Sequence, residues 1–476
     1  MKNTIKVMAF LLIAAMFFAL CSCAADGADG DFALDYNAGD SDKVSFDGAE
    51  FSFFINSTYY TDEEYVLGYV VNTPFADLVL DRISNIESEY NVKMNIINTT
   101  NEVAKTLQTQ AISGMDTYSA VQANSGNIAS AARADLLYDI STLSDYINYL
   151  DIEKWGDVQQ RKSMFWNGGL YGVYPCAWPL LKYNSTEGII VVNEAMIKQL
   201  SMEDPREYIE NNTWTWSKFE ELMPIYAHTD STGNYVYAYY STIHWLFRAM
   251  QLTNGDPVVY RDGSDWALGV YTPTSIEAYE RAYDWAFGEY KDYVYIEPGN
   301  VWTNLLPNFV DGKSVTAIIN ATQIYSQSDA VAYLMDDFGI LHLPVGPNAN
   351  EKTTGTTFND LSFATAIPLL TEDPEFSAFI LDKLYAPLPG YEDEQSIIDY
   401  LMRYYFYDER DIVTFINCYR NAQYEYRLEN LTDIVINIDG SKTVMQWIDS
   451  YRDAYEADRV KYAVNMEDTR VALFGE

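Results

Sequence analysis

Two of the four cysteines, Cys21 and Cys23, lie where an apolar run ends, and a thiol at such a place can be joined to a lipid. The run extends from Met8 to Leu20 and follows two lysines, the order of charged and apolar residues that export machinery reads as a signal peptide. A membrane-spanning helix needs roughly 20 apolar residues, more than this run contains. We therefore expect an export signal rather than a permanent transmembrane anchor.

The tetrapeptide Leu20-Cys21-Ser22-Cys23 resembles a bacterial lipobox, in which a leucine and then a small residue precede the lipidated thiol. Cys23 fits this pattern because Ser22 precedes it, whereas Cys21 follows the bulky Leu20. We predict cleavage of a signal peptide spanning residues 1–22 and a diacylglyceryl thioether on Cys23, which anchors the exported chain to the outer face of the bacterial cytoplasmic membrane. Bacterial lipoproteins carry two or three acyl chains, enough for stable anchoring. The alternative is an ordinary signal peptide that is cleaved nearby.

The other thiols and the imidazoles indicate no further chemistry. Cys176 and Cys418 could form a disulfide outside the cell, but their spacing does not show whether they pair. His228, His244 and His342 lack the i, i+4 spacing of a helical metal site, and no EF-hand loop pattern is present. We expect no metal and no cofactor.

Length and composition indicate an acidic globular protein with two domains. The chain has 476 residues, more than one hydrophobic core usually serves. It carries 30 basic and 69 acidic side chains, a net charge of −39 that repels nucleic acid and anionic lipid headgroups. We interpret this charge as a source of solubility outside the cell, in preference to recruitment of a cationic ligand. The 48% of hydrophobic and 15% of aromatic residues exclude wholesale disorder.

The elements that must position any site begin after residues 23–42, a stretch rich in Ala, Gly, Asp and Ser that is typical of a flexible tether. Apolar and amphipathic segments then follow in the order strand, helix, strand, helix, strand, helix. This order forms an open parallel sheet with helices on both faces, so we predict an α/β fold. The strands are expected at 51–56, 92–97 and 118–122, and the helices at 76–90, 103–112 and 127–137.

The pattern changes after Trp166. Further strands are expected at 187–193, 309–320 and 338–347. A helix is expected near Ser217, because Ser217 and Glu220 have the spacing of a capping box. From Asp373 onward the sequence is largely helical in pattern.

Five short motifs resemble, in order, those of the family 1 extracellular solute-binding proteins, the substrate-capturing lipoproteins of sugar-type ABC importers. They are Gly169–Pro175, Val191–Asn193, Thr215–Phe219, Phe309–Lys313 and Gly339–Pro347. Each motif alone is weak evidence for the family, but five motifs in the family's order, behind a lipobox, are strong evidence. The resemblance covers essentially the whole mature chain. Three departures point to a substrate that differs from maltose-type sugars: Val191-Val192 replaces an aromatic pair, Tyr174 is an extra residue, and Asn320-Ala321-Thr322 replaces a common Gly-x-Trp.

The resemblance implies two α/β lobes, each an open sheet flanked by helices, joined by a hinge and holding the ligand in the cleft between them. It implies a first lobe of residues 43–170 plus roughly 309–365, and a second of residues 171–308 plus roughly 366–476. The expected function is capture of a carbohydrate, with an oligosaccharide preferred, and its delivery to an ABC permease. The protein is then a monomer and not an enzyme, and it binds neither nucleic acid nor, apart from its lipid, the membrane.

Sugars present C–H faces and hydroxyl edges, so their sites pair flat aromatic rings with amides and carboxylates. In open α/β sheets such ligands lie beyond the carboxyl ends of strands. We expect Trp214 and Trp216 to be packing residues. The ligand-binding candidates, chosen from segments that follow strands or match the family's pattern, are Tyr59, Tyr60, Asn124, Ser125, Asn127, Trp178, Trp245, Trp302, Asn320, Asn359 and Asp360.

Two other functions use the same features. A surface receptor that senses glycans could have the same fold. An anchored glycoside hydrolase needs only two carboxylates beside a sugar, and some such pair is inevitable among 69 acidic residues. The absence of an eightfold strand–helix pattern and the five motifs in register argue against the hydrolase.

Overall fold

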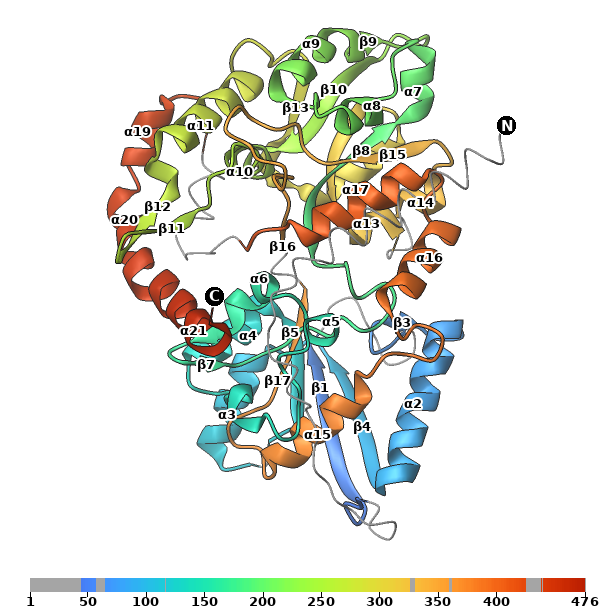
Figure 1. The fold of residues 1–476 in the computed structure, drawn as a ribbon, viewed down its shortest axis with the longest axis vertical. Helices are drawn as coiled ribbons and strands as arrows, with labels where there is room; N and C mark the ends of the chain where they lie inside the picture. Colours follow the sequence, from blue (N-terminus) through green and yellow to red (C-terminus); the bar gives the residue numbers. More distant parts are fainter. Residues whose placement is uncertain are drawn as a thin grey trace. The chain divides into compact units, whose positions relative to one another are not determined.

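The computed structural model describes residues 44–56, 65–115, 117–325, 330–358, 362–424, 438 and 440–475. The chain is α/β and contains two main sheets, each with its own hydrophobic core (Figure 1). The predicted signal peptide, the tether and Cys23 lie outside the described residues. Within the described part, no helix combines the length and the apolar character needed to cross a membrane.

The first lobe is built on a four-stranded sheet. In spatial order its strands are β17 (Phe363–Ala366), β5 (Ala120–Asn124), β1 (Ala49–Asn56) and β4 (Val92–Thr99). The strands β1, β4 and β5 are parallel, and β17 runs antiparallel to β5. Phe51, Phe53, Phe54 and Ile55 of β1 are all buried, as expected for a strand covered on both faces.

Helices cover this sheet. The helix α2 (Pro74–Tyr90) packs against β4, and α3 (Val103–Ser113) packs against β5. Thr73 starts α2 by accepting a hydrogen bond from the Ala76 amide at 3.4 Å, and Asn91 ends it in the left-handed region with φ 50°. Local sequence therefore sets both ends of this helix.

The second lobe is built on a mixed sheet. In spatial order its main strands are β13 (Val294–Glu297), β10 (Tyr235–Thr242), β14 (Ser314–Asn320), β8 (Thr186–Asn193) and β15 (Phe338–Leu341). The strands β10, β13 and β14 are parallel, and β8 is antiparallel to β14 and β15. Every residue of β8 and β14 is buried, which places these two strands at the centre of the second core.

The expected lobe boundaries need correction. Residues 309–365 were expected in the first lobe, but β14 and β15 both pair with β8 in the second sheet. Residues from 366 onward were expected in the second lobe, but α15 (Pro374–Leu384) belongs to the first core. The apolar pattern of a strand or helix shows that the segment is buried but not in which of the two cores, and this is the origin of both errors.

The first crossing between the lobes also lies later than expected. The motif Gly169–Pro175 remains in the first lobe, where Val173 forms a bridge with Thr365 of β17. Trp178 still belongs to the first core and Tyr183 is the next residue of the second core, so the chain crosses between these two positions.

Two predicted helices differ from the observed ones at their ends. The helix expected at 127–137 is α4, which spans Ser125–Arg133. Leu137 lies beyond its end and forms an isolated bridge with Pro368. The helix expected near Ser217 is α9 (Trp216–Tyr226), and its cap is Thr215, whose hydroxyl accepts from the Lys218 amide at 3.2 Å.

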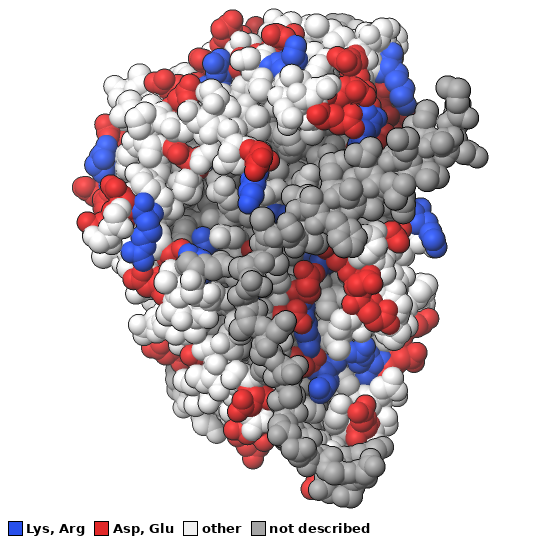
Figure 2. Space-filling model, viewed as in Figure 1, with Lys and Arg blue, Asp and Glu red and all other residues white. Residues whose placement is uncertain are grey.

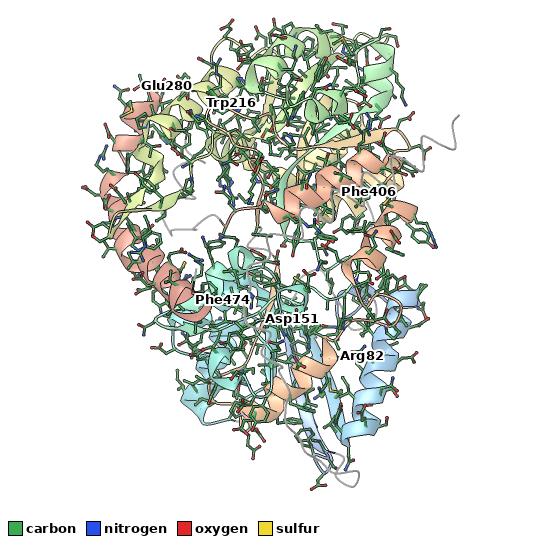
Figure 3. The ribbon with its side chains drawn as sticks, viewed as in Figure 1. Arg82, Asp151, Trp216, Glu280, Phe406 and Phe474 are labelled. Carbon is green, nitrogen blue, oxygen red and sulfur yellow. The ribbon has the colours of Figure 1, made fainter. Side chains whose placement is uncertain are left out.

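The C-terminal helices connect the lobes once more. The helix α20 (Arg452–Asp458) leads through a π-helical turn (Arg459–Ala463) into α21 (Val464–Phe474). Thr469 of α21 accepts a hydrogen bond from the Gly168 amide at 2.8 Å. Phe474, at the end of α21 (Figure 3), packs on Phe165 of the first core. The end of α21 is therefore fixed to the first lobe, although residues 366–476 were expected in the second.

The two described cysteines are free and buried. Cys176 belongs to the first core and Cys418 to the second, so they do not form a disulfide. Burial raises the pKa of Cys176 to about 12.

Candidate functional site

Each sheet has one edge at which its parallel strands end. In the first lobe these strands end at Asn56, Thr99 and Asn124, which we call the first edge. In the second lobe they end at Thr242, Glu297 and Asn320, which we call the second edge. Ligands of open α/β sheets bind beyond such carboxyl ends, so these two edges are the candidate site.

The first edge brings three predicted residues together at the start of α4. The Oδ1 atom of Asn124 accepts a hydrogen bond from the Asn127 amide at 2.9 Å and so caps the helix. Ser125 is buried and its amide donates to the Ser362 carbonyl at 2.9 Å, whereas Asn124 and Asn127 are half-buried. A helix N-terminus favours oxygen atoms with negative partial charge, such as those of hydroxyl groups or anions.

At the second edge, Trp245 lies in the first turn of α10 (Ile243–Thr253). The hydroxyl of Thr242, the last residue of β10, accepts a hydrogen bond from the Trp245 amide at 3.2 Å and thereby starts the helix. The Trp245 side chain is half-buried and packs against the second core. The cap therefore places the indole next to the carboxyl end of β10.

A buried ion pair lies beside this tryptophan. Arg248, one turn further along α10, donates from Nη1 to Oε2 of Glu187 at 3.5 Å, and both side chains are buried. Glu187 pairs with Asn320 in the register of β8 and β14. The sequence reasoning missed Arg248 and Glu187, because a charged residue within an apolar helix or strand does not reveal its partner.

Asn320 has a role in the local turn. Its Oδ1 atom accepts from the Thr322 hydroxyl at 2.6 Å and from the Gln323 amide at 3.0 Å. These bonds start the short helix α13 (Thr322–Tyr325) directly after β14, and the side chain is buried.

A second buried carboxylate, Glu297, ends β13 and was also missed. It accepts hydrogen bonds from the Tyr240 hydroxyl and, at 2.6 Å, from Nδ2 of Asn304. Burial and the bond to Glu297 raise the pKa of Tyr240 above its ordinary range, so its hydroxyl remains a donor. The half-buried Trp302 lies between Glu297 and Asn304 in sequence. The position of Glu297 at the end of an apolar strand was the signal that could have identified it.

The prediction that Trp178 contacts the ligand is wrong. Its side chain is 0% exposed, its Nε1 donates to the Ala386 carbonyl at 2.9 Å, and its ring packs on Tyr69 and Tyr385 with centroids 6.0 and 4.9 Å away. No ring face is left for a ligand in this structure. The position after a lobe crossing suggested a cleft residue, but Trp178 precedes the crossing and fills the first core.

Trp214 and Trp216 are packing residues, as predicted. Both are buried in the second core. Trp214 donates from Nε1 to the His342 carbonyl at 2.8 Å. Trp216, labelled in Figure 3, donates from Nε1 to the Thr253 hydroxyl at 3.1 Å. The remaining candidates, Tyr59, Tyr60, Asn359 and Asp360, lie outside the described residues.

Comparison with known proteins finds structures of similar fold at low sequence identity to this chain. No protein-family model and no curated protein sequence matches the chain. Solved structures do match. A sugar transporter protein from Rhizobium etli in an open conformation has a TM-score of 0.60 and 14% identity, and the match covers 86% of this chain and 100% of that one.

Two further structures were solved with ligands. An ABC substrate-binding protein from Listeria monocytogenes, in complex with cycloalternan, has a TM-score of 0.55 and 15% identity, with 87% of this chain and 99% of that one covered. UgpB from Mycobacterium tuberculosis, in complex with glycerophosphocholine, has a TM-score of 0.57 and 14% identity, with 87% and 98% covered. At these identities the likeness shows the fold, and the chain therefore has the two-lobe α/β fold of ABC-transporter substrate-binding proteins.

Proposed function

We propose that the protein is a lipid-anchored extracellular solute-binding protein that captures a carbohydrate between its two lobes and delivers it to an ABC permease. The observation that carries the proposal is the second edge, where Glu297 ends β13 and Trp302 and Trp245 follow the neighbouring strands β13 and β10. The fold supports it because the matched structures include a sugar transporter protein and a complex with a cyclic oligosaccharide.

The chemistry of the second edge suits a ligand with hydroxyl groups rather than an anion. Glu187 is engaged by Arg248, and Glu297 is engaged by Tyr240 and Asn304. The Glu187 charge is balanced by that of Arg248. The Glu297 carboxylate is held by two neutral donors, so its negative charge disfavours an anionic ligand and leaves it suited to accept hydrogen bonds from hydroxyl groups. An indole face beside hydrogen-bonded polar groups is the combination that fits the C–H faces and hydroxyls of a sugar ring.

The charge of the surface supports a role outside the cell. Figure 2 shows acidic and basic side chains interspersed over the visible face, and the net charge of the whole chain is −39. Such a surface favours solubility and disfavours binding to nucleic acid. We expect transport rather than sensing, with an oligosaccharide as cargo.

The proposal is tested by thermal denaturation of the exported protein with a panel of maltotriose, cellotriose, lactose and glycerophosphocholine. Glycerophosphocholine belongs in the panel because one matched structure holds it. A ligand present at 100 times its dissociation constant stabilises the folded state by about 2.7 kcal/mol. We expect at least one saccharide to raise the melting temperature. Stabilisation by glycerophosphocholine alone would contradict a carbohydrate cargo.

The anchor is tested separately. We expect Cys23→Ala to release the protein into the medium or to leave the precursor uncleaved, because the acylated thiol is lost. Cell fractionation and metabolic labelling with a fatty acid measure both results. Cys21→Ala is the matched control and should leave anchoring unchanged. If Cys21→Ala alone abolishes labelling, the lipidated residue is Cys21.

A further inference from the structure

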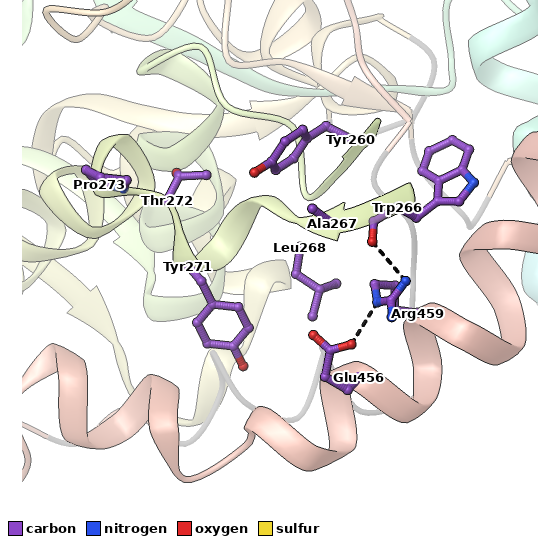
Figure 4. Close-up of a pocket in the computed structure, with 9 residues that line it drawn as sticks. All are labelled: Tyr260, Trp266, Ala267, Leu268, Tyr271, Thr272, Pro273, Glu456 and Arg459. Atoms are coloured by element: carbon purple, nitrogen blue, oxygen red, sulfur yellow. Dashed lines mark hydrogen bonds and ion pairs between the residues drawn. The ribbon is translucent and has the colours of Figure 1, made fainter. Parts of the chain in front are cut away.

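A cavity of about 430 Å³ lies between the hairpin of β11 (Val259–Asp262) and β12 (Asp265–Leu268) and the helix α20 (Figure 4). Among the described residues, none of the candidates predicted from the sequence lines it. The hairpin follows the C-terminal end of α10, whereas Trp245 lies at the N-terminal end. The cavity is lined by Tyr260, Trp266, Ala267, Leu268, Tyr271, Thr272, Pro273, Glu456 and Arg459.

The aromatic part of the lining is held in place by arginines. The guanidinium of Arg261 lies over the Trp266 ring, 4.1 Å from its centroid, and that of Arg452 lies over the Tyr271 ring at the same distance. Cation–π contacts of this kind fix the orientation of both rings. Arg459 donates from Nη1 to the Trp266 carbonyl at 2.8 Å, so the hairpin is also tied to the turn that follows α20.

The two charged residues that line the cavity, Glu456 and Arg459, form an ion pair with each other. Arg459 donates from Nε to Oε2 of Glu456 at 2.8 Å. The pair leaves no net charge to select an ion, yet the exposed carboxylate retains a second oxygen, Oε1, that can accept hydrogen bonds from hydroxyl groups. The half-buried Tyr260 adds an aromatic side chain and a phenolic hydroxyl.

We propose that this cavity is a second binding site, separate from the two strand edges, for a neutral saccharide. The half-buried Tyr260 offers an aromatic ring to the apolar face of a sugar, whereas the buried Trp266 ring lies beneath Arg261 and forms part of the wall. The balanced Glu456–Arg459 pair suits the hydroxyls of the sugar. The volume lies within the range of about 300–1,000 Å³ that is typical of small-molecule sites. The ligand class follows from this lining alone, so the site can exist even if the cargo between the lobes is not a sugar.

The test is ¹⁹F NMR of the full-length protein in detergent, labelled with 5-fluorotryptophan. Trp266→Phe assigns the resonance of Trp266, and Trp245→Ala assigns that of Trp245. Maltotriose, cellotriose and lactose are each titrated to tens of millimolar. We expect at least one of them to shift the Trp266 resonance saturably, also in the Trp245→Ala variant. The Trp245 resonance reports binding at the second edge independently.

Two variants test the lining. Glu456 is exposed and Tyr260 is half-buried, so Glu456→Ala and Tyr260→Ala should fold. Each should weaken the titration followed at Trp266 by about tenfold or more, a loss of roughly 1.4 kcal/mol. The proposal is overturned if no saccharide shifts the Trp266 resonance saturably, or if both variants retain the wild-type titration.

Discussion

Two tryptophans illustrate how burial separates a ligand-facing ring from a packing ring. Trp245 is half-buried at the N-terminus of α10, whereas Trp178 is fully enclosed in the first core and hydrogen-bonded through Nε1. Both lie in segments whose pattern suggested a cleft position, and the partial exposure of its ring distinguishes Trp245. The sequence could therefore nominate aromatic residues but could not show which of their faces remain open.

We predict opposite effects of removing these two side chains. Trp245→Ala should weaken ligand binding by roughly one to two decades, since the loss of buried apolar area adds to the about 0.5–1.5 kcal/mol that an aromatic pair contributes beyond it. It should lower the free energy of unfolding by less than the loss of a fully buried tryptophan does, because the half-buried side chain leaves no sealed cavity. Ligand titration and chemical denaturation of the same sample measure both quantities.

Trp178→Ala is the matched control. It should lower the free energy of unfolding by about 3–5 kcal/mol, the usual cost of removing a large buried side chain. The folded fraction should bind ligand with wild-type affinity. Loss of stability in Trp245→Ala with affinity intact would instead make Trp245 a packing residue.

At the scale of elements, a buried carboxylate joins three parts of the second lobe. Asp411 of α17 (Glu409–Arg420) accepts from Nε and Nη2 of Arg206 at 2.7 and 2.8 Å, and from the Ile340 amide of β15 at 2.8 Å. Arg206 begins the short helix α8 (Arg206–Glu210), and both Arg206 and Asp411 are buried. Asp411 thus fixes α17 and α8 against the edge strand β15.

Asp411→Ala should destabilise the protein by about 3–5 kcal/mol, because it leaves the Arg206 charge and a strand amide without their buried partner. Chemical denaturation gives this value. Asp337→Ala, which breaks an exposed ion pair with Lys198 at 2.9 Å, is the control and should cost about 0–1 kcal/mol. A loss below 1 kcal/mol in Asp411→Ala would show that Asp204 and Glu194, which also contact Arg206, compensate fully.

The sequence predicted whether a segment is a strand or a helix better than it predicted which other elements that segment contacts. The apolar runs at 51–56 and 187–193 became β1 and β8, because continuous burial leaves a clear trace in the sequence. The assignment of β14 and β15 to a lobe failed, since pairing depends on contacts between residues that are far apart in the chain. Glu187 and Arg248 were missed for the same reason, because their meeting requires α10 to lie over β8.

At the scale of the whole molecule, several segments connect the two cores. The chain passes from Trp178 to Tyr183, from Phe358 to the strand β17, and from Leu388 to Ile397. The helix α21 adds a fourth connection through its contacts with the first core. Connections of this kind allow hinge bending, and a ligand that touches both lobes stabilises the closed form through its additional contacts there.

Small-angle X-ray scattering tests the central claim, capture of a carbohydrate by closure of two lobes, most directly. The exported protein is measured alone and with a saturating amount of the saccharide that stabilises it most in thermal denaturation. We predict a smaller radius of gyration in the bound state, because contacts with both lobes favour the closed form. An unchanged radius of gyration at proven saturation would contradict capture between the lobes.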